Sequence, residues 1–174
     1  MYKKTNNYAY IDGQNLNLGV QSLGWKLDYR RFRIYLREKY NITNAYLFIG
    51  FIPENHKLYT ALQQSGYILK FKPTLANSEG QYKGNLDGDL ILQLLIDFFD
   101  HKFDAAVIVT SDGDFYSVVK FLYDKNKLLA VLSPYLKTCS YLLRRTAREK
   151  LQFMNTLKNK LEYKRKTPPK DETN

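Results

Sequence analysis

Short runs of apolar residues alternate along the chain with stretches in which apolar residues recur every three or four positions. Five runs are rich in aromatic, aliphatic or β-branched residues and are bounded by Gly, Pro, Asn or Asp, which is typical of buried strands. They are residues 8–11, 45–50, 67–71, 105–110 and 128–132. Since helical patterns lie between them, the sequence predicts a parallel sheet covered by helices on both faces.

The helical stretches differ in how much apolar surface they carry. One is expected after Asp28, one from Asn55 to a stop at Gly66, and one from about Asp114 to Lys125. Residues 89–101 are apolar around most of the circumference, which predicts a central helix covered on two sides. Together these elements predict a three-layer α/β/α sandwich, Rossmann-like, with about five parallel strands in the order 3-2-1-4-5.

The C-terminal part carries one long apolar stripe and then none. Leu143, Ala147, Leu151, Met154, Leu157 and Leu161 are spaced by three or four residues. This spacing predicts a helix over residues 138–163 that follows a domain of residues 1–137 and packs on it, or on a second copy of the chain in a homodimer. Residues 164–174 are basic and lack apolar anchors, so a disordered tail is expected.

Charge and composition restrict the class of protein. Lys and Arg number 27 against 17 Asp and Glu, a net charge of +10 that favours polyanions such as nucleic acid, although compositional bias toward Lys is an alternative explanation. The single Cys139 excludes an internal disulfide and a four-cysteine zinc site. Neither a signal peptide nor 18 consecutive apolar residues is present, so we expect a cytoplasmic protein without a membrane span.

Acidic residues stand where predicted strands end and a predicted helix begins. Asp12 follows the first strand, Asp112 and Asp114 follow the fourth, and Asp87 and Asp89 lie at the start of the most apolar helix. In open parallel sheets, ligands bind beyond the carboxyl ends of the strands, at the point where the strand order reverses. With the order 3-2-1-4-5, that point lies between strands one and four, where these carboxylates converge.

Converging carboxylates need a proton or a cation, because two of them about 6 Å apart cost roughly 3 kcal/mol at an effective dielectric constant near 20. Oxygen ligands without His or Cys suit Mg²⁺ or Mn²⁺, and such a site can promote attack of water on a phosphodiester. Asn15, Thr110 and Ser111 are candidates for orienting water or phosphate. Turn formation and helix capping are the alternative roles for these side chains and for each Asp-Gly-Asp.

Other acidic or phosphate-binding motifs fit less well. No Glu follows an Asp-rich loop at EF-hand distance, and the glycines of a P-loop are missing. A metal-chelating Asp-x-Asp of a nucleotide-sugar transferase stays open.

Three motifs in order resemble the NYN-domain (LabA-like) branch of the PIN-like nucleases. They are Asp-Gly-Gln-Asn-Leu at 12–16, Lys-Gly-Asn-Leu-Asp at 83–87, and Val-Thr-Ser-Asp-Gly-Asp-Phe at 109–115. The resemblance spans about residues 8–135. The last motif departs from the usual Ser-Gly-Asp-x-Asp-Phe, because Thr110 and Ser111 stand in place of Ser-Gly.

The resemblance implies a PIN-like fold and endonucleolytic cleavage of RNA with a divalent metal. It implies that Asp12, Asp87 and Asp112 hold Mg²⁺ or Mn²⁺ with Asp114 assisting. Asp89 is then the N-cap of the helix or a residue that contacts the metal ligands, and Thr110 also contacts these ligands. We also assign substrate positioning to Lys83, with Asn15 and Ser111. The expected activity is that of a ribonuclease acting on flexible or single-stranded RNA, and the alternative is a non-catalytic module that binds nucleic acid or protein.

Overall fold

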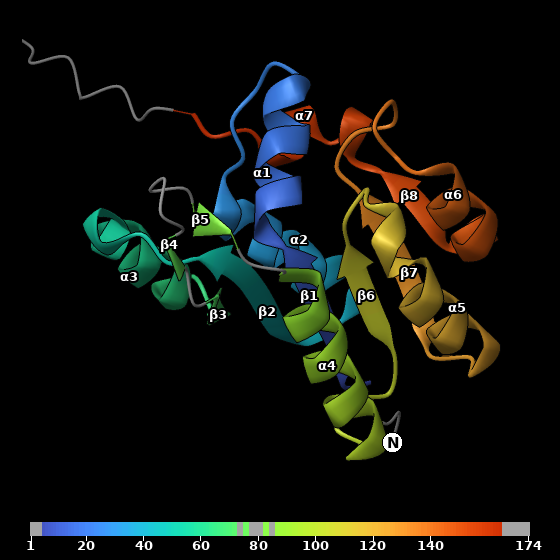
Figure 1. The fold of residues 1–174 in the computed structure, drawn as a ribbon. Helices are drawn as coiled ribbons and strands as arrows, with labels where there is room; N and C mark the ends of the chain where they lie inside the picture. Colours follow the sequence, from blue (N-terminus) through green and yellow to red (C-terminus); the bar gives the residue numbers. More distant parts are fainter. Residues whose placement is uncertain (1–4, 73–74, 77–81, 84–85, 165–174) are drawn as a thin grey trace, which may run out of the picture.

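The computed structural model of the protein describes residues 5–72, 75–76, 82–83 and 86–164. Six strands form one parallel sheet in the order β3-β2-β1-β6-β7-β8 (Figure 1). In that order they are β3 (Tyr67–Lys72), β2 (Ile42–Gly50), β1 (Asn7–Asp12), β6 (Ala106–Val109), β7 (Leu128–Ser133) and β8 (Leu151–Phe153). The predicted order of five strands is confirmed, and β8 adds a sixth beside β7.

Helices cover both faces of this sheet, which gives the predicted α/β/α sandwich (Figure 1). One face carries α1 (Gly13–Ser22), α2 (Tyr29–Tyr40), α3 (His56–Gln64) and α7 (Lys158–Leu161). The other carries α4 (Leu86–Phe99), α5 (Tyr116–Asp124) and α6 (Tyr141–Ala147). A separate antiparallel pair joins β4 (Leu75–Ala76) to β5 (Tyr82–Lys83), and short 3₁₀ turns lie at Pro53–Asn55, Gly113–Phe115, Arg148–Lys150 and Met154–Thr156.

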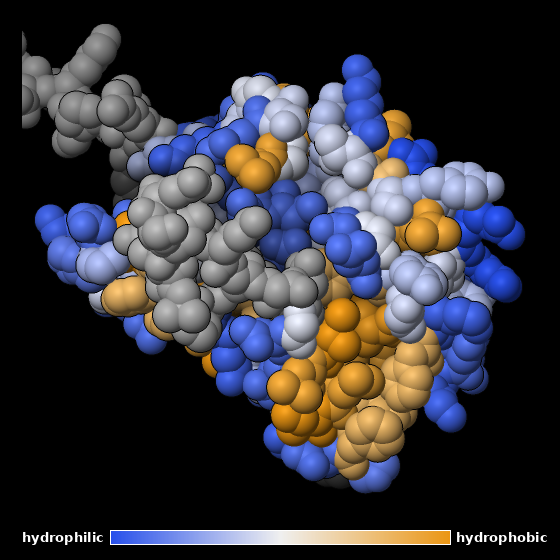
Figure 2. Space-filling model, viewed as in Figure 1, coloured by the Kyte–Doolittle hydropathy of each residue, from blue (hydrophilic) through white to orange (hydrophobic). Residues whose placement is uncertain are grey.

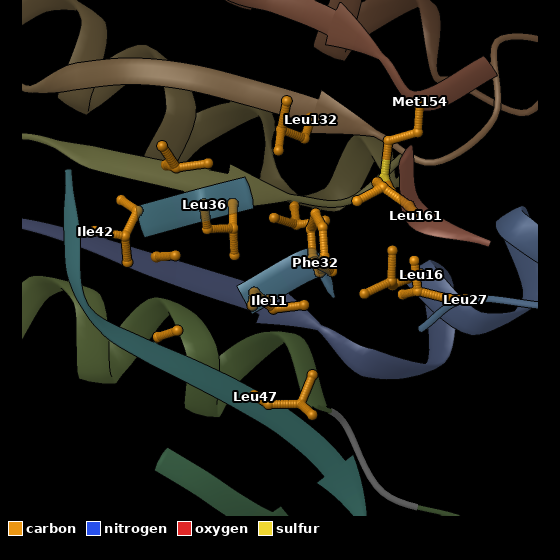
Figure 3. Close-up of a cluster of buried hydrophobic side chains, with 14 of the residues drawn as sticks. Ile11, Leu16, Leu27, Phe32, Leu36, Ile42, Leu47, Leu132, Met154 and Leu161 are labelled. Carbon is orange, nitrogen blue, oxygen red and sulfur yellow. The ribbon is translucent and has the colours of Figure 1, made fainter. Parts of the chain in front are cut away.

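Strand β1 is buried along its whole length and supplies both cores, since successive side chains of a strand point to opposite faces. Ala9 and Ile11 belong to the α1–α2 core (Figure 3), whereas Tyr8 and Tyr10 belong to the α4–α5 core. Local signals set the helix ends: Asp28 caps α2 by accepting a hydrogen bond from the Arg31 amide at 3.0 Å. Helix α2 therefore begins where the sequence predicts it.

Helix α4 is tied to β1 by a buried polar cluster around Asp97. This carboxylate has no exposed surface and accepts hydrogen bonds from the Tyr10 hydroxyl at 2.9 Å, Gln93 Nε2 at 3.0 Å and Lys102 Nζ at 3.2 Å. Burial and the bond to Asp97 raise the pKa of Tyr10 far above its ordinary value, so its hydroxyl stays a donor. The cluster fixes α4 against the strand that ends in Asp12.

The expectation that α4 is covered on two sides is wrong. Leu90 and Leu94 are buried against the sheet, but Leu92, Ile96 and Phe99 are 57%, 44% and 66% exposed. Figure 2 shows the resulting apolar area over α4, below a polar region of the same face. The sheet covers only one side of α4, and the helix begins at Leu86 rather than at Asp89.

The single helix expected over residues 138–163 is also wrong. Helix α6 ends at Ala147, where Arg148 takes a φ of 49°, and the chain then enters β8, a 3₁₀ turn and the short α7. A positive φ is costly for a non-glycine residue and cannot continue a right-handed helix. The boundary at residue 137 therefore does not separate a domain from a helix, because β8 belongs to the main sheet.

The apolar stripe is nevertheless buried within this chain. Leu143 and Ala147 belong to the α4–α5 core, while Met154 and Leu161 reach the α1–α2 core beside Phe32 and Leu16 (Figure 3). Of the predicted tail, residues 165–174 lie outside the described residues. Within the described part, no helix is long and apolar enough to cross a membrane.

Because α7 closes the core, Leu161→Ala should lower the free energy of unfolding by about 2–5 kcal/mol. Leu161 is 1% exposed, whereas Leu142 on α6 is 51% exposed and serves as the matched control. Leu142→Ala should change stability by less than about 0.5 kcal/mol. Urea unfolding measures both. Equal, small effects would show that the C-terminal segment does not pack on the core.

Candidate active site at the carboxyl end of the sheet

The predicted site residues gather where β1 and β6 end, side by side in the centre of the sheet (Figure 1). Strand β1 lies between β2 and β6 in the sheet. This is the position at which the strand order reverses and where open parallel sheets bind ligands. Asp12 is the last residue of β1, and residues 110–114 follow directly after β6.

Asp12 is held in a fixed orientation. It is only 7% exposed, caps α1 by accepting a hydrogen bond from the Asn15 amide at 3.0 Å, and accepts a second bond from Thr110 Oγ1 at 3.4 Å. Gly13 lets the helix start against the sheet, since a Cβ there would lie 2.8 Å from the Phe48 carbonyl oxygen and 2.5 Å from Ile49 Cγ2. Steric contact with β2 thus explains why glycine follows Asp12 in the first motif.

Thr110 joins the two acidic loops through one buried hydroxyl. Its Oγ1 donates toward Asp12 Oδ2 and accepts a hydrogen bond from the Asp112 amide at 3.1 Å. The side chain has no exposed surface. This geometry agrees with the supporting position expected for Thr110, behind the carboxylates rather than among groups that face solvent.

Asn15 and Ser111 link the same loops in a second way. The Asn15 side-chain oxygen accepts a hydrogen bond from the Ser111 amide at 2.8 Å. The Ser111 hydroxyl is 2% exposed and lies 2.9 Å from the Ser133 hydroxyl at the end of β7. Ser111 therefore faces the neighbouring strand, and substrate positioning by its side chain does not fit this placement.

Asp112 and Asp114 stand on the solvent side of this network. Asp112 is half-buried and its Oδ1 accepts a hydrogen bond from the Asp114 amide at 3.0 Å, while Asp114 is exposed. Ser140 lies against Gly113 between them: a Cβ on Gly113 would collide with Ser140 Oγ and lie 3.0 Å from its Cβ. The Ser140 amide also donates to the Ser111 carbonyl at 2.9 Å. Sequence reasoning missed Ser140 and Ser133, which carry no motif.

The second motif reaches the site through the start of α4. Asp87 lies in the first turn, but its side chain and that of Lys83 lie outside the described part of the structure. Asp89 is exposed and lies inside the helix, not at its N-cap. It lines a cleft of about 300 Å³ between α4 and β3, together with Phe48 and Lys70.

The described residues therefore bring Asp12 and the loop of Asp112 and Asp114 together through Thr110, which bonds to the Asp12 carboxylate and to the Asp112 backbone amide. Within the described residues, no group of three acidic, His or Cys side chains is arranged to hold a metal ion. The donor set nevertheless fits a hard divalent cation, because the available ligands are carboxylate oxygens at the ends of neighbouring strands.

Comparison with known proteins identifies the family of this chain. The family model of the NYN domain matches residues 8–152, which include all three motifs and the first two residues of β8. The chain belongs to the NYN domain family. The fold is that of the PIN-like proteins, and the family is of the nuclease type.

One curated protein and one solved structure extend the comparison of this NYN protein. The "Low amplitude and bright protein LabA" of Synechococcus elongatus is 29% identical over 133 residues, which cover 71% of each chain. A solved structure of a protein of unknown function from Vibrio parahaemolyticus aligns with a TM-score of 0.76 at 20% identity, over 92% of this chain and 98% of the other. That likeness shows the fold.

The close approach of Gly113 and Ser140 generates a test of how the acidic loop is held. Gly113→Ala should lower the free energy of unfolding by about 1–3 kcal/mol, because the added methyl group overlaps Ser140. Ser140→Gly in the same chain should recover most of that loss. The control is Gly88→Ala, since a Cβ there meets nothing within 4 Å and alanine favours the helix. Additive effects of the two substitutions, measured by thermal unfolding, would contradict the contact.

Proposed function

We propose that this NYN protein is an endoribonuclease that hydrolyses phosphodiester bonds of flexible or single-stranded RNA with Mg²⁺ or Mn²⁺. The observation that carries the proposal lies at the reversal of strand order, where the buried Thr110 hydroxyl donates to the Asp12 carboxylate and accepts from the backbone amide of Asp112.

Asp12 and Asp112 would hold the metal, with Asp87 and Asp114 as further carboxylates. When bound, the cation supplies an activated water and stabilises negative charge on the phosphate oxygens. The chain supplies order: Asn15 and Thr110 keep both acidic loops in place before substrate arrives. Because these groups are already oriented, little reorganisation is needed during the reaction.

RNA is the proposed substrate because the chain carries a net charge of +10 around an acidic centre. The basic body attracts the phosphate backbone, while the carboxylates bind it only through a cation. Asp114, which is exposed beside Asp112, would orient water on the solvent side. We further propose a cytoplasmic location, where RNA of this kind is available.

Purified protein should cut single-stranded RNA when Mg²⁺ or Mn²⁺ is added and stop when EDTA is added. Asp12→Asn and Asp112→Asn should each lower kcat/KM by at least about 100-fold, because each removes a charged ligand. Asp124→Asn is the matched control, since Asp124 pairs with Lys120 at the far end of α5 and is 55% exposed. A labelled oligoribonucleotide measures the rates.

Two outcomes would contradict the proposed activity. Unchanged rates in Asp12→Asn and Asp112→Asn would place the chemistry elsewhere. RNA binding without turnover in either metal would favour the non-catalytic binding module instead.

Metal binding should also stabilise the native state, because the cation relieves repulsion between the carboxylates. At 100 times the dissociation constant the gain is about 2.7 kcal/mol, seen as a rise in Tm with Mn²⁺ concentration. Asp12→Asn should reduce this rise while keeping the cap of α1, since Asn caps helices as well as Asp does. An unreduced rise would show that the cation binds at another position.

A further inference from the structure

A basic segment lies directly beside the acidic loop. Ser140 contacts Gly113 and donates its amide to Ser111, so the next residue, Tyr141, begins α6 next to the site. Consecutive Cα atoms are 3.8 Å apart, which keeps Tyr141 within a few ångströms of that contact. We call residues 134–148 the α6 rim.

Tyr141 is 70% exposed, although Leu143 and Ala147 on the same helix have no exposed surface. One helical turn later, Arg145 holds its guanidinium 5.8 Å from the centre of the Tyr141 ring. The pair presents an aromatic face and a cation on one side of α6. Tyr116, 42% exposed, starts α5 after the same acidic loop and adds a second aromatic side chain.

The charge of the α6 rim has one sign. Its 15 residues contain one Lys, three Arg and no Asp or Glu. Arg144 is used inside the fold, where it donates to the Cys139 carbonyl at 3.2 Å and to the Leu136 carbonyl. Lys137, Arg145 and Arg148 remain exposed. Arg148 stacks over the Tyr123 ring next to Glu149, so Lys137 and Arg145 are the exposed cations that the α6 rim adds beside carboxylates that by themselves would repel a polyanion.

The bonds of Arg144 also hold the first part of the α6 rim against the helix. They close residues 136–139 onto α6, and the guanidinium packs 5.6 Å from the Phe153 ring of β8. A prearranged surface loses less conformational entropy on binding. Exposed aromatic rings combined with Arg are what proteins use to bind unstacked bases of single-stranded nucleic acid.

We propose that Tyr141 and Arg145 form a platform for one nucleobase of single-stranded RNA, on the Asp112 side of the scissile phosphate. The base stacks on the Tyr141 ring and Arg145 contacts the adjoining phosphate. Because a paired base keeps its neighbours in the stack, the platform selects single strands over duplexes. This inference rests on the proposed function, since it takes RNA as the substrate.

Equilibrium binding of a labelled single-stranded oligoribonucleotide, in EDTA to prevent cleavage, tests the platform. Tyr141→Ala should weaken binding by about 5- to 150-fold, the range for loss of one base–aromatic stack, and Tyr141→Phe should restore affinity. The matched control is Tyr163→Ala. Tyr163 is 50% exposed, and Lys26 Nζ lies 5.5 Å from the centre of its ring. Lys26 follows the end of α1 that is remote from Asp12, and this helix is about 15 Å long, so Tyr163 is far from the site.

An RNA series makes the test specific. Replacing one base next to the cleavage position by an abasic nucleotide should weaken binding to the native protein but not further weaken binding to Tyr141→Ala, since the two changes remove the same contact. Arg145→Gln should reduce the salt dependence by about 0.7 in the log–log slope.

The outcomes separate the two proposals. If the native protein neither binds nor cuts RNA, the proposed function fails. If the native protein cuts RNA but Tyr141→Ala binds single-stranded RNA as well as Tyr163→Ala does, the platform alone is overturned. The same holds if Tyr141→Ala weakens the binding of blunt duplex RNA as much as that of single-stranded RNA.

Discussion

The hydrogen bonds that join the end of β1 to the loop after β6 are the constraint on which the site depends. The Asn15 side chain holds the Ser111 amide, and Thr110 lies between Asp12 and the Asp112 amide. These bonds span 96 to 98 residues of sequence between the two loops. Without them, the loop that carries Asp112 and Asp114 would not be held against the end of β1, where Asp12 lies.

The rest of the molecule can be understood as support for this constraint. The buried Asp97 cluster fixes α4, which carries Asp87, against the strand of Asp12. The C-terminal segment completes the sheet with β8 and brings Ser140 onto the acidic loop. The acidic site thus belongs to a chain with a net positive charge, and the α6 rim carries positively charged side chains beside it.

Much of the fold could be predicted from the sequence because buried parallel strands leave continuous apolar runs with polar ends. Those ends also located Asp12 and Asp112, since the carboxyl ends of parallel strands meet on one side of the sheet. The C-terminal prediction failed for a physical reason. The apolar spacing of Leu143 to Leu161 satisfies a helix, but pairing of β8 with β7 and the positive φ of Arg148 are tertiary features that periodicity does not encode.

Individual roles at the site were harder to predict than its position. Ser111 was predicted to position the substrate, but its hydroxyl is hydrogen-bonded to that of Ser133. Ser133 comes near Ser111 only in the folded sheet. Helix α1 was not predicted, because residues 13–22 are rich in Asn, Gln and Gly and carry only sparse apolar positions. Its start depends on Gly13 fitting against β2, a contact between distant segments.

The central claim is that carboxylates at the end of β1 and β6 promote attack of water on phosphorus, and the chemistry of the cleaved ends tests it most directly. RNA cut in ¹⁸O-labelled water should carry one ¹⁸O in its new terminal phosphate, and a substrate with 2′-O-methyl groups should still be cut, because water and not the 2′-hydroxyl is the nucleophile. A 2′,3′-cyclic phosphate without ¹⁸O would contradict the account.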